Sequence, residues 1–549
     1  MEFNLSEVNE AVAVAVAERE AIVWRDVRRT HAELARRSRR LANCLIDRGL
    51  AAAGESDGRP PWESNQPHVA LYMYNCPEYI EAMLGAFKAR AVPVNVNYRY
   101  VADELLYLMN DSRAEALIYH AEFAPNVAEI LHHFPRMRTL IQVPDDSNND
   151  LLEGAVWYED ALAAASDAPP PRTCSPDDLY VLYTGGTTGM PKGVLWRQAD
   201  IFMAALGGRT QAGAEVADLD VIVAAAVKGA FRSMPTAPLM HAAHWSAFDA
   251  LHAGNTVVLQ DQTKRLDAAS ILGTAARERV HLIQIIGDAF ARPLVDELEA
   301  GSYDLEELRV IVSGGAILSA TVKEQMLALL PPQVRIIDTV GSSETGRQAN
   351  QTSSRSRGAS TGTFKPGPGA AVLSADKTRR LEIGDEETGW FAQSGRVPTG
   401  YLGDREKTEK TFPTVDGVRY SVPGDRARLL ADGSIEVLGR DSVTINTGGE
   451  KVFAEEVEGV LKRHPAVYDA VVCGRPSERW GQEVVAVVQL RPGASASDEE
   501  LRESCAEHVA RYKLPKAFIY RDKIERSPIG KPDYRWAVEV ATQPRAVKR

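Results

Sequence analysis

The hydrophobic residues of the chain gather in short apolar runs that alternate with longer segments of helical spacing. Runs typical of buried strands occur at residues 68–74, 92–97, 256–260, 280–286, 308–315 and 334–344. The segment at 77–91, between the first two runs, has its apolar residues at helical spacing. Strands that are buried on both faces have near-continuous apolar sequences, and their alternation with helices is typical of parallel α/β layers. The sequence therefore predicts an α/β fold.

The length of the apolar runs and the local composition change twice toward the C-terminus. A chain of 549 residues is too long for a single core and is expected to divide into domains. After about residue 360 the runs shorten and Gly/Pro turns multiply, which predicts a small β subdomain at about 360–440. Another compact unit begins near residue 443. We expect an N-terminal domain at 1–441, with layered α/β subdomains and a small β-barrel, and a smaller α+β C-terminal domain at 442–549.

Composition narrows the class of protein. A net charge of −12 argues against nucleic-acid binding, and the basic cluster at 35–40 is expected on a solvated helix face. The five cysteines lack C-x-x-C spacing, which indicates a reducing compartment and neither a zinc site nor a disulfide framework. The apolar stretch at 11–17 is too short for a membrane span and has no basic segment before it. We expect a cytoplasmic protein, and we leave open both peripheral membrane contact and oligomer formation.

The segment "VLYTGGTTGMPKGVLW" at 181–196 combines glycines, threonines and one lysine. Glycines permit close backbone approach, and free N–H groups with hydroxyls and an ammonium form an anion-binding concavity. A Walker A loop leads into a helix, whereas here Pro191 and Gly193 flank Lys192 and an apolar strand-like run follows. The loop is thus expected to bind phosphate while joining two strands, although in isolation a mobile hairpin tip fits equally well.

Four further motifs follow in order: "TVGSSETG" at 339–346, "YSVPGDRARL" at 420–429, "LGRDSVTINTGGEKVFAEEVE" at 438–458 and "RSPIGKPDYR" at 526–535. With the glycine-rich loop they resemble the motif set of the adenylate-forming superfamily, which contains acyl-CoA synthetases, luciferases and peptide-synthetase adenylation domains. The resemblance covers nearly the whole chain. It is closest to bacterial fatty acyl-CoA synthetases, including the group similar to steroid side-chain CoA ligases.

The resemblance implies a two-step reaction that uses ATP, Mg²⁺ and CoA. A carboxylate attacks the α-phosphate of ATP to give an acyl-AMP and pyrophosphate, and a thiol then displaces AMP. Positioning and electrostatic stabilisation would carry the first step. The implied cradle for the β- and γ-phosphates comprises Thr184, Gly186, Thr187, Thr188, Gly189 and Lys192, and we count Thr188 among the catalytic residues.

The remaining nucleotide contacts implied by the resemblance come from later motifs. Glu344 would hold Mg²⁺, a hard cation suited to one carboxylate plus phosphate oxygens. The other implied contacts are Ser343 beside the α-phosphate, Gly315 and Ala316 against the adenine, Asp425 on the ribose diol, and Arg440 on the ribose or a phosphate.

The C-terminal unit is implied to supply the catalytic lysine. Lys531 would bridge the substrate carboxylate and the α-phosphate as charge moves between them. Gly448 and Gly449 would let the pantetheine arm of CoA pass between the domains, and Ser442 occupies the hinge position.

The acyl pocket is expected from the segments that lead into the ATP motifs. The candidate substrate-binding residues are His241, Trp245, Ile286, Phe290 and Ile317. His241 is interpreted either as a packed or gating residue or as a residue lining the acyl or thiol route. Asp288 is interpreted as a structural hydrogen-bonding residue, and Arg292 as the one basic candidate for a second carboxylate. Apolar walls predict a medium- to long-chain fatty acid or a steroid side-chain acid.

Three positions depart from the family pattern: Gly185 replaces a loop serine, Val340 an aromatic residue, and Ser442 an aspartate or lysine. None of these changes removes a charge that the chemistry needs. The alternatives are an acyl-AMP ligase that loads a carrier protein and a non-catalytic ligand-binding relative. The presence of Lys192, Glu344 and Lys531 argues against the second alternative.

Overall fold

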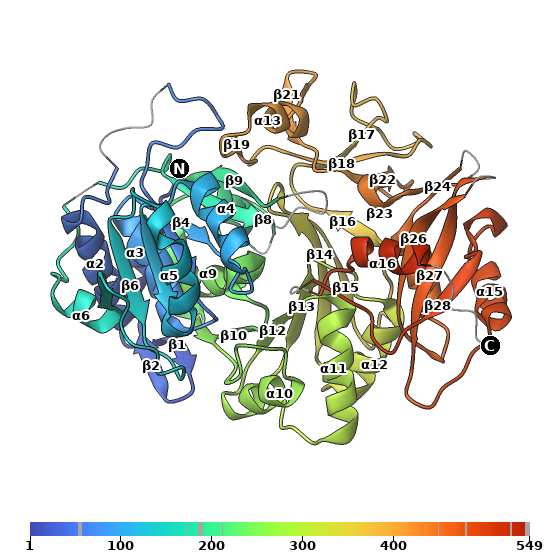
Figure 1. Cartoon of the computed structure of the whole chain (residues 1–549), viewed down its shortest axis with the longest axis horizontal. Coiled ribbons are helices and arrows are strands. Elements are labelled where there is room, and N and C mark those ends of the chain that lie inside the picture. The colour runs from blue at the N-terminus through green and yellow to red at the C-terminus, as the bar shows by residue number, and fades with distance from the viewer. Residues whose placement is uncertain are drawn as a thin grey trace.

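The computed structural model describes residues 1–52, 58–171, 173–184, 190–210, 212–447, 450–477, 480–527 and 530–543 (Figure 1). Six of the expected site residues lie outside these ranges: Gly186, Thr187, Thr188, Gly189, Gly448 and Gly449. The departure at Gly185 lies outside them as well.

A large sheet supplies the strand ends on which most of the motifs lie. Its parallel part is β1 (Glu20–Trp24), β11 (Thr256–Val258), β10 (Arg232–Pro235), β12 (Leu282–Ile285), β13 (Val310–Gly314) and β14 (Arg335–Ser342), with β2 (Val27–Thr30) antiparallel at the edge. The helices of this region are α10 (Ala268–Arg277), α11 (Gly287–Ala300) and α12 (Ala320–Leu329). The carboxyl ends of these parallel strands form the edge where α/β proteins bind ligands.

Antiparallel strands continue the same sheet toward the C-terminus. They are β15 (Gly346–Ser353), β16 (Thr363–Pro366), β17 (Ala370–Leu373), β18 (Gly389–Ser394), β20 (Thr414–Val415), β21 (Val418–Ser421), β22 (Asp425–Leu429) and β23 (Ile435–Arg440), accompanied by α13 (Arg405–Thr411). The β-rich region expected at about 360–440 is therefore present. It is joined to the large sheet through the pairing of β15 with β16.

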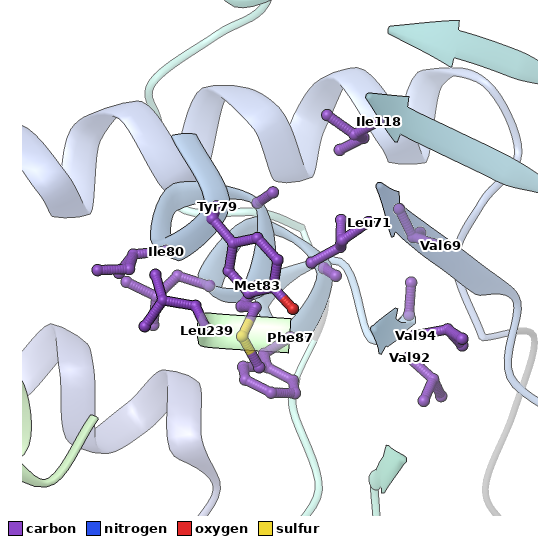
Figure 2. Packing of buried hydrophobic residues seen from close by; sticks show 14 of the residues in the cluster. Val69, Leu71, Tyr79, Ile80, Met83, Phe87, Val92, Val94, Ile118 and Leu239 are labelled. Atoms are coloured by element: carbon purple, nitrogen blue, oxygen red, sulfur yellow. The ribbon is translucent and has the colours of Figure 1, made fainter. Parts of the chain in front are cut away.

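A second parallel sheet forms the N-terminal layer. Its order is β4 (Val92–Asn95), β3 (His68–Tyr72), β5 (Ala116–His120), β6 (Thr139–Val143) and β7 (Ala155–Trp157). Figure 2 shows how Tyr79, Met83 and Phe87 of one helix pack against side chains of these strands. The helices of this half are α1 (Leu5–Ala15), α2 (His31–Asp47), α3 (Pro77–Lys88), α4 (Ala102–Ser112), α5 (Ala124–Ile130), α6 (Tyr158–Ala163), α7 (Gln198–Ala205), α8 (Leu219–Lys228) and α9 (His244–His252).

The strands on either side of the glycine-rich loop belong to a three-stranded sheet. Strands β8 (Leu179–Thr184) and β9 (Lys192–Arg197) pair antiparallel, and β19 (Gly400–Tyr401) pairs with β9. The prediction that the loop joins two strands is confirmed.

The C-terminal unit is a separate five-stranded sheet with helices packed against it (Figure 1). Its elements are β24 (Ile445–Thr447), β25 (Glu450–Val452), β26 (Val467–Ser477), β27 (Gly481–Leu490), β28 (Ala517–Tyr520), α14 (Ala454–Leu461), α15 (Asp498–Ala506) and α16 (Tyr534–Thr542). Neighbouring residues of β26 alternate between two apolar clusters, because successive side chains of a strand point to opposite faces.

The basic cluster at 35–40 was expected on a solvated helix face, but two of its arginines form partly buried ion pairs. Arg37 donates to the fully buried Glu81 at 2.7 Å, and Arg39 pairs with Glu10 at 2.6 Å. The sequence pattern could not reveal these acceptors because they come from α3 and α1. Among the described residues, no helix is both long enough and apolar enough to cross a membrane.

Candidate active site

The strand ends that flank the glycine-rich loop hold two of the expected phosphate ligands, Thr184 and Lys192, opposite each other. Thr184 and Lys192 are Cα partners in the antiparallel register. The Lys192 ammonium lies 3.6 Å from Asp111 and 3.7 Å from Asp404. Burial opposes the charge of Lys192, but these carboxylates together with Tyr107 outweigh it and raise the lysine pKa. Lys192 is therefore a cation held by two acidic side chains that sequence reasoning did not find.

Glu344 is fixed by contacts from distant strands. Its side chain is 9% exposed, and Tyr401 Oη donates to carboxylate Oε1 at 2.9 Å. Ser421 Oγ donates to the Glu344 carbonyl at 2.6 Å, and Trp196 Nε1 donates to the Ser343 carbonyl at 2.8 Å. Carboxylate Oε2 makes no hydrogen bond within the described part of the chain. The turn between β14 and β15 therefore presents a fixed carboxylate with one oxygen available to a ligand.

Asp425 and Arg440 face each other across two paired strands. They are Cα partners in β22 and β23, and Arg440 Nε lies 3.1 Å from Asp425 Oδ1. The carboxylate of Asp425 raises the pKa of Arg440 against the effect of burial, and Glu344 and Glu455 act in the same direction. The two nucleotide residues implied by separate motifs thus form one ion pair beside Glu344.

Glu455 on α14 brings another carboxyl group from the C-terminal unit to this ion pair. It packs on the strand backbone, because a Cβ placed on Gly439 would lie 2.7 Å from Glu455 Oε2. Burial, followed by the charges of Glu458 and Asp425, raises the pKa of Glu455 to about 8 despite the opposing effect of Arg440. At neutral pH this carboxyl group is mostly protonated.

The raised pKa predicts a pH-dependent gain in stability for Glu455→Gln. The unfolded carboxyl group titrates near pH 4.3, so wild-type stability falls as pH rises from there to about 8. Glutamine does not titrate, and we expect it to raise the free energy of unfolding at pH 9 relative to pH 5 by at least about 1.4 kcal/mol, the value of one pKa unit. Thermal melts at both pH values measure this difference. Glu456→Gln on the same helix is the control, and an equal effect of Glu455→Gln at both pH values would contradict the assignment.

Lys531 reaches this site from the C-terminal unit. Burial lowers its pKa, Arg440 lowers it further, and Glu344, Asp425 and Glu455 act in the opposite direction. These electrostatic neighbours are the carboxylates and the guanidinium of the preceding motifs. The structure therefore brings Lys531 together with Glu344, Asp425 and Arg440, which lie 91 to 187 residues earlier in the chain.

The expected adenine contacts lie in the turn after β13. Gly315 has φ +86°, a conformation that favours glycine, and Asp288 N donates to the Ile317 carbonyl at 2.9 Å. Ala316 touches the same helix start, since a Cβ on Gly287 would lie 2.9 Å from its carbonyl oxygen. The side chain of Ile317 is 38% exposed. The turn after β13 therefore contacts the N-terminus of α11 directly.

The expected acyl-pocket residues divide between two parts of the core. Ile286 and Phe290 belong to one cluster. Ile286 lies beside the turn of Gly315, because its Cγ2 is 3.9 Å from a Cβ built on that glycine. Phe290 lies beside the segment of Gly530, because its Cδ2 is 3.9 Å from a Cβ built on that glycine. Trp245 belongs to the other cluster, where its Nε1 donates to a tyrosine hydroxyl at 2.8 Å. The structure places the first two near Lys531 and leaves Trp245 in the N-terminal core.

His241 lies in the π-helical turn η3 (Leu239–Ala243) with non-helical φ and ψ. Burial lowers its pKa to about 3, and the charge of Lys531 is the next cause. Its Nε2 is buried without a hydrogen-bond partner among the described residues. A neutral ring beside Lys531 agrees with either earlier interpretation, a packed gate or a wall of the acyl or thiol route.

Asp288 and Arg292 both contact other groups of the protein, although Asp288 Oδ2 and Arg292 Nε and Nη2 make no hydrogen bond among the described residues. Asp288 Oδ1 accepts from Ser319 N at 2.8 Å and from Ser319 Oγ at 3.0 Å. Arg292 lies 3.7 Å from Asp288 and over the ring of Tyr468 at 5.4 Å. The structural interpretation of Asp288 agrees with this geometry. Arg292, considered above as a partner for a second substrate carboxylate, instead faces the C-terminal unit.

The structure adds Tyr401, Asp111, Asp404 and Glu455 to the site. Tyr401, Asp111 and Asp404 have no sequence signal that distinguishes them from ordinary surface or core residues, because each reaches the site through a pairing with a distant segment. Glu455 lies within the motif at 438–458, and it reaches the site because α14 packs on β23. Ser442 lies in the short 3₁₀ turn η4 (Asp441–Val443), between β23 and β24.

Sequence comparisons find relatives along the whole chain. The AMP-binding enzyme family matches residues 9–396, and the AMP-binding enzyme C-terminal domain matches residues 456–531. The medium-chain acyl-CoA ligase Mig of Mycobacterium avium is 53% identical over 98% of both chains. A medium/long-chain-fatty-acid–CoA/3-oxocholest-4-en-26-oate–CoA ligase of Mycobacterium tuberculosis is 41% identical over 98% of this chain and 96% of its own.

Solved structures share the fold. The anthranilate CoA ligase AuaEII, in complex with anthranoyl-AMP, superposes with a TM-score of 0.82 at 21% identity over 98% of both chains. ATP-bound MatB from Rhodopseudomonas palustris has a TM-score of 0.80 at 23% identity over 99% of both chains. The chain therefore belongs to the AMP-binding enzyme family, as do the acyl-CoA ligases that it matches from end to end.

Proposed function

We propose that the protein is an ATP-dependent acyl-CoA ligase for hydrophobic carboxylic acids. A carboxylate oxygen attacks the α-phosphorus of ATP and pyrophosphate leaves. The CoA sulfur then attacks the acyl carbon, and AMP leaves with the bridging oxygen. The observation that carries this proposal is the position of Lys531 among Glu344, Asp425 and Arg440.

The charges of this site suit the first step. Lys531 and Arg440 supply positive charge where the carboxylate and the α-phosphoryl group must meet, and Asp425 provides an acceptor for ribose hydroxyls. Preorganised charges of this kind stabilise the transition state without reorganisation during the reaction. Lys192 would exchange its contacts with Asp111 and Asp404 for the outer phosphates.

The carboxylate of Glu344 fits a magnesium ion. Magnesium prefers oxygen ligands and commonly binds one or two carboxylates plus substrate phosphates. Glu344 offers one oxygen while Tyr401 holds the other. A bound Mg²⁺ would neutralise phosphate charge.

The proposal extends to the domain motion and to two glycine-containing segments. We propose that residues 442–549 move as a domain about Ser442. We also propose that Gly448 and Gly449 pass the pantetheine arm, and that Gly186, Thr187, Thr188 and Gly189 bind phosphate. The segments that contain these glycines and threonines lie outside the described residues.

The substrate is proposed to be a medium- or long-chain fatty acid or a steroid side-chain acid. The names of the relatives at 53% and 41% identity support this class. The ion pairs of Asp288 with Arg292 and Lys462 support it as well, because the charges of Asp288 and Arg292 already face opposite charges of the protein.

A panel of acids tests the substrate class. We expect kcat/KM to rise from acetate through octanoate to palmitate, because each buried methylene contributes about 0.8 kcal/mol. Benzoate, phenylalanine and a C24 steroid acid complete the panel, with AMP release measured in the presence of ATP, Mg²⁺ and CoA. A preference for acetate or phenylalanine would overturn the substrate class. Replacement of CoA by acyl carrier protein distinguishes the carrier-loading alternative.

A further inference from the structure

One face of α11 carries charged residues that contact the C-terminal unit. Asp288, Arg292 and Asp296 lie four residues apart and therefore on one stripe of the helix. Asp288 Oδ2 is 3.7 Å from Lys462 Nζ, and the Arg292 guanidinium lies 5.4 Å from the centre of the Tyr468 ring. Tyr468 Oη donates to Asp296 Oδ2 at 3.2 Å. The stripe is thus a docking surface for residues that follow α14 and begin β26.

The ionic contacts continue from this surface to the segment that bears Lys531. Lys462 Nζ lies 3.5 Å from Asp469 Oδ1. Arg526 donates to both oxygens of Asp469, at 2.8 Å through Nε and at 2.7 Å through Nη2. Its remaining terminal nitrogen, Nη1, donates to the Gly530 carbonyl at 2.9 Å. A single guanidinium therefore links a buried carboxylate to the peptide group immediately before Lys531.

The backbone around Lys531 is fixed from two sides. Ser527 N donates to the Lys531 carbonyl at 2.8 Å, and Lys531 N donates to Ser527 Oγ at 3.1 Å. Gly530 has φ +73°, and a Cβ placed on it would lie 2.6 Å from Ala289 Cβ of α11. The segment therefore rests directly against the helix that carries the charged stripe.

The charged side chains between α11 and the C-terminal unit are buried. Asp288, Arg292, Lys462 and Asp469 are each at most 7% exposed. Burial alone would raise the pKa of Asp469, but the charges of Lys462, Arg526 and Arg292 lower it to about 2. Removing one member of a buried ionic cluster leaves an uncompensated charge, so loss of any one of these charges is expected to destabilise the contact between α11 and the C-terminal unit.

We infer that Arg526 is a positioning residue for Lys531. It holds the Gly530 carbonyl while its ion pair with Asp469 is docked on α11 through Lys462. The inference rests on the proposed function, in which Lys531 acts in acyl-AMP formation. Displacing a reacting group by about 1 Å can cost about 10²-fold in rate. Loss of the contact between Arg526 and the peptide group before Lys531 is therefore expected to lower the rate of acyl-AMP formation.

Arg526→Lys is the test substitution, because lysine keeps the charge but lacks the planar fork that bonds Asp469 and Gly530 together. The assay is octanoate-dependent exchange of labelled pyrophosphate into ATP. We expect an exchange rate about tenfold lower than wild type with an unchanged melting temperature. Ser527→Ala, which leaves the ionic cluster intact, should lower the rate several-fold.

Arg475→Lys is the matched control. Arg475 donates to Glu483 at 2.8 Å and to the Ala541 carbonyl at 3.2 Å, so it too bonds one carboxylate and one backbone carbonyl within the C-terminal unit. It makes no described contact with α11 or the Lys531 segment. We expect wild-type exchange from this variant.

Combination with Lys531→Ala separates positioning from general structural damage. If Arg526 acts through Lys531, Arg526→Lys should lower exchange less than twofold further in the Lys531→Ala background. A tenfold loss in both backgrounds, or wild-type activity of Arg526→Lys and Ser527→Ala, overturns the inference. Absence of exchange in the wild type with every acid of the panel would instead overturn the proposed function, and the inference with it.

Discussion

Lys531→Ala is expected to lower the rate of acyl-AMP formation by about 10²-fold or more, the scale of losing a preorganised charge partner. Lys531 is the cation that the C-terminal unit contributes beside Glu344, Asp425 and Arg440. Acid-dependent pyrophosphate exchange measures this half-reaction. Thioester formation from supplied acyl-AMP should remain largely intact, since the proposed motion of the C-terminal domain takes this lysine away from the site.

The exposed Lys523 provides the control for this substitution. Lys523→Ala removes a lysine from the same unit and should leave both half-reactions unchanged. Equal losses of adenylation and thioester formation in Lys531→Ala would contradict a lysine that serves the first step alone.

Glu344→Gln is expected to lower kcat/KM for ATP by about 10²- to 10³-fold, the range for losing one preorganised electrostatic contact. The substitution keeps the shape of the side chain and an acceptor for Tyr401, but it removes the charge proposed to hold Mg²⁺. The Mg²⁺ concentration for half-maximal rate should rise as well. Initial rates over a Mg²⁺ titration measure both effects.

Glu386, an exposed residue, gives the matched control. Glu386→Gln should leave the Mg²⁺ dependence unchanged. If Glu344→Gln lowered the rate while the half-maximal Mg²⁺ concentration stayed at the wild-type value, Glu344 would not be the metal ligand.

The sequence was most informative where one local pattern determines structure. The apolar runs at 280–286, 308–315 and 334–344 became β12, β13 and β14 because parallel strands are buried on both faces. The residues around Lys192 excluded a helix after the glycine-rich loop, and β9 follows there. The ordered motifs predicted Glu344, Asp425, Arg440 and Lys531 as site residues, and the fold brings the charges of these four residues together.

Features that depend on distant pairings were not predictable in this way. Tyr401 reaches Glu344 because β19 pairs with β9, and Glu455 reaches Arg440 because α14 packs on β23. Arg36 is exposed as expected, but the expected exposure was wrong for Arg37 and Arg39, since their acceptors lie on other helices. The role of Arg292 was equally hidden, because its partner Tyr468 belongs to another domain.

Transfer of oxygen from the acid to AMP tests the central claim most directly. The experiment incubates octanoate labelled with ¹⁸O in both carboxylate oxygens with the protein, ATP, Mg²⁺ and CoA, and it analyses the AMP by mass spectrometry. Attack of the carboxylate on the α-phosphorus, followed by cleavage of the acyl–oxygen bond by the thiol, predicts one ¹⁸O atom in each AMP formed. AMP without ¹⁸O alongside octanoyl-CoA would contradict an acyl-AMP intermediate.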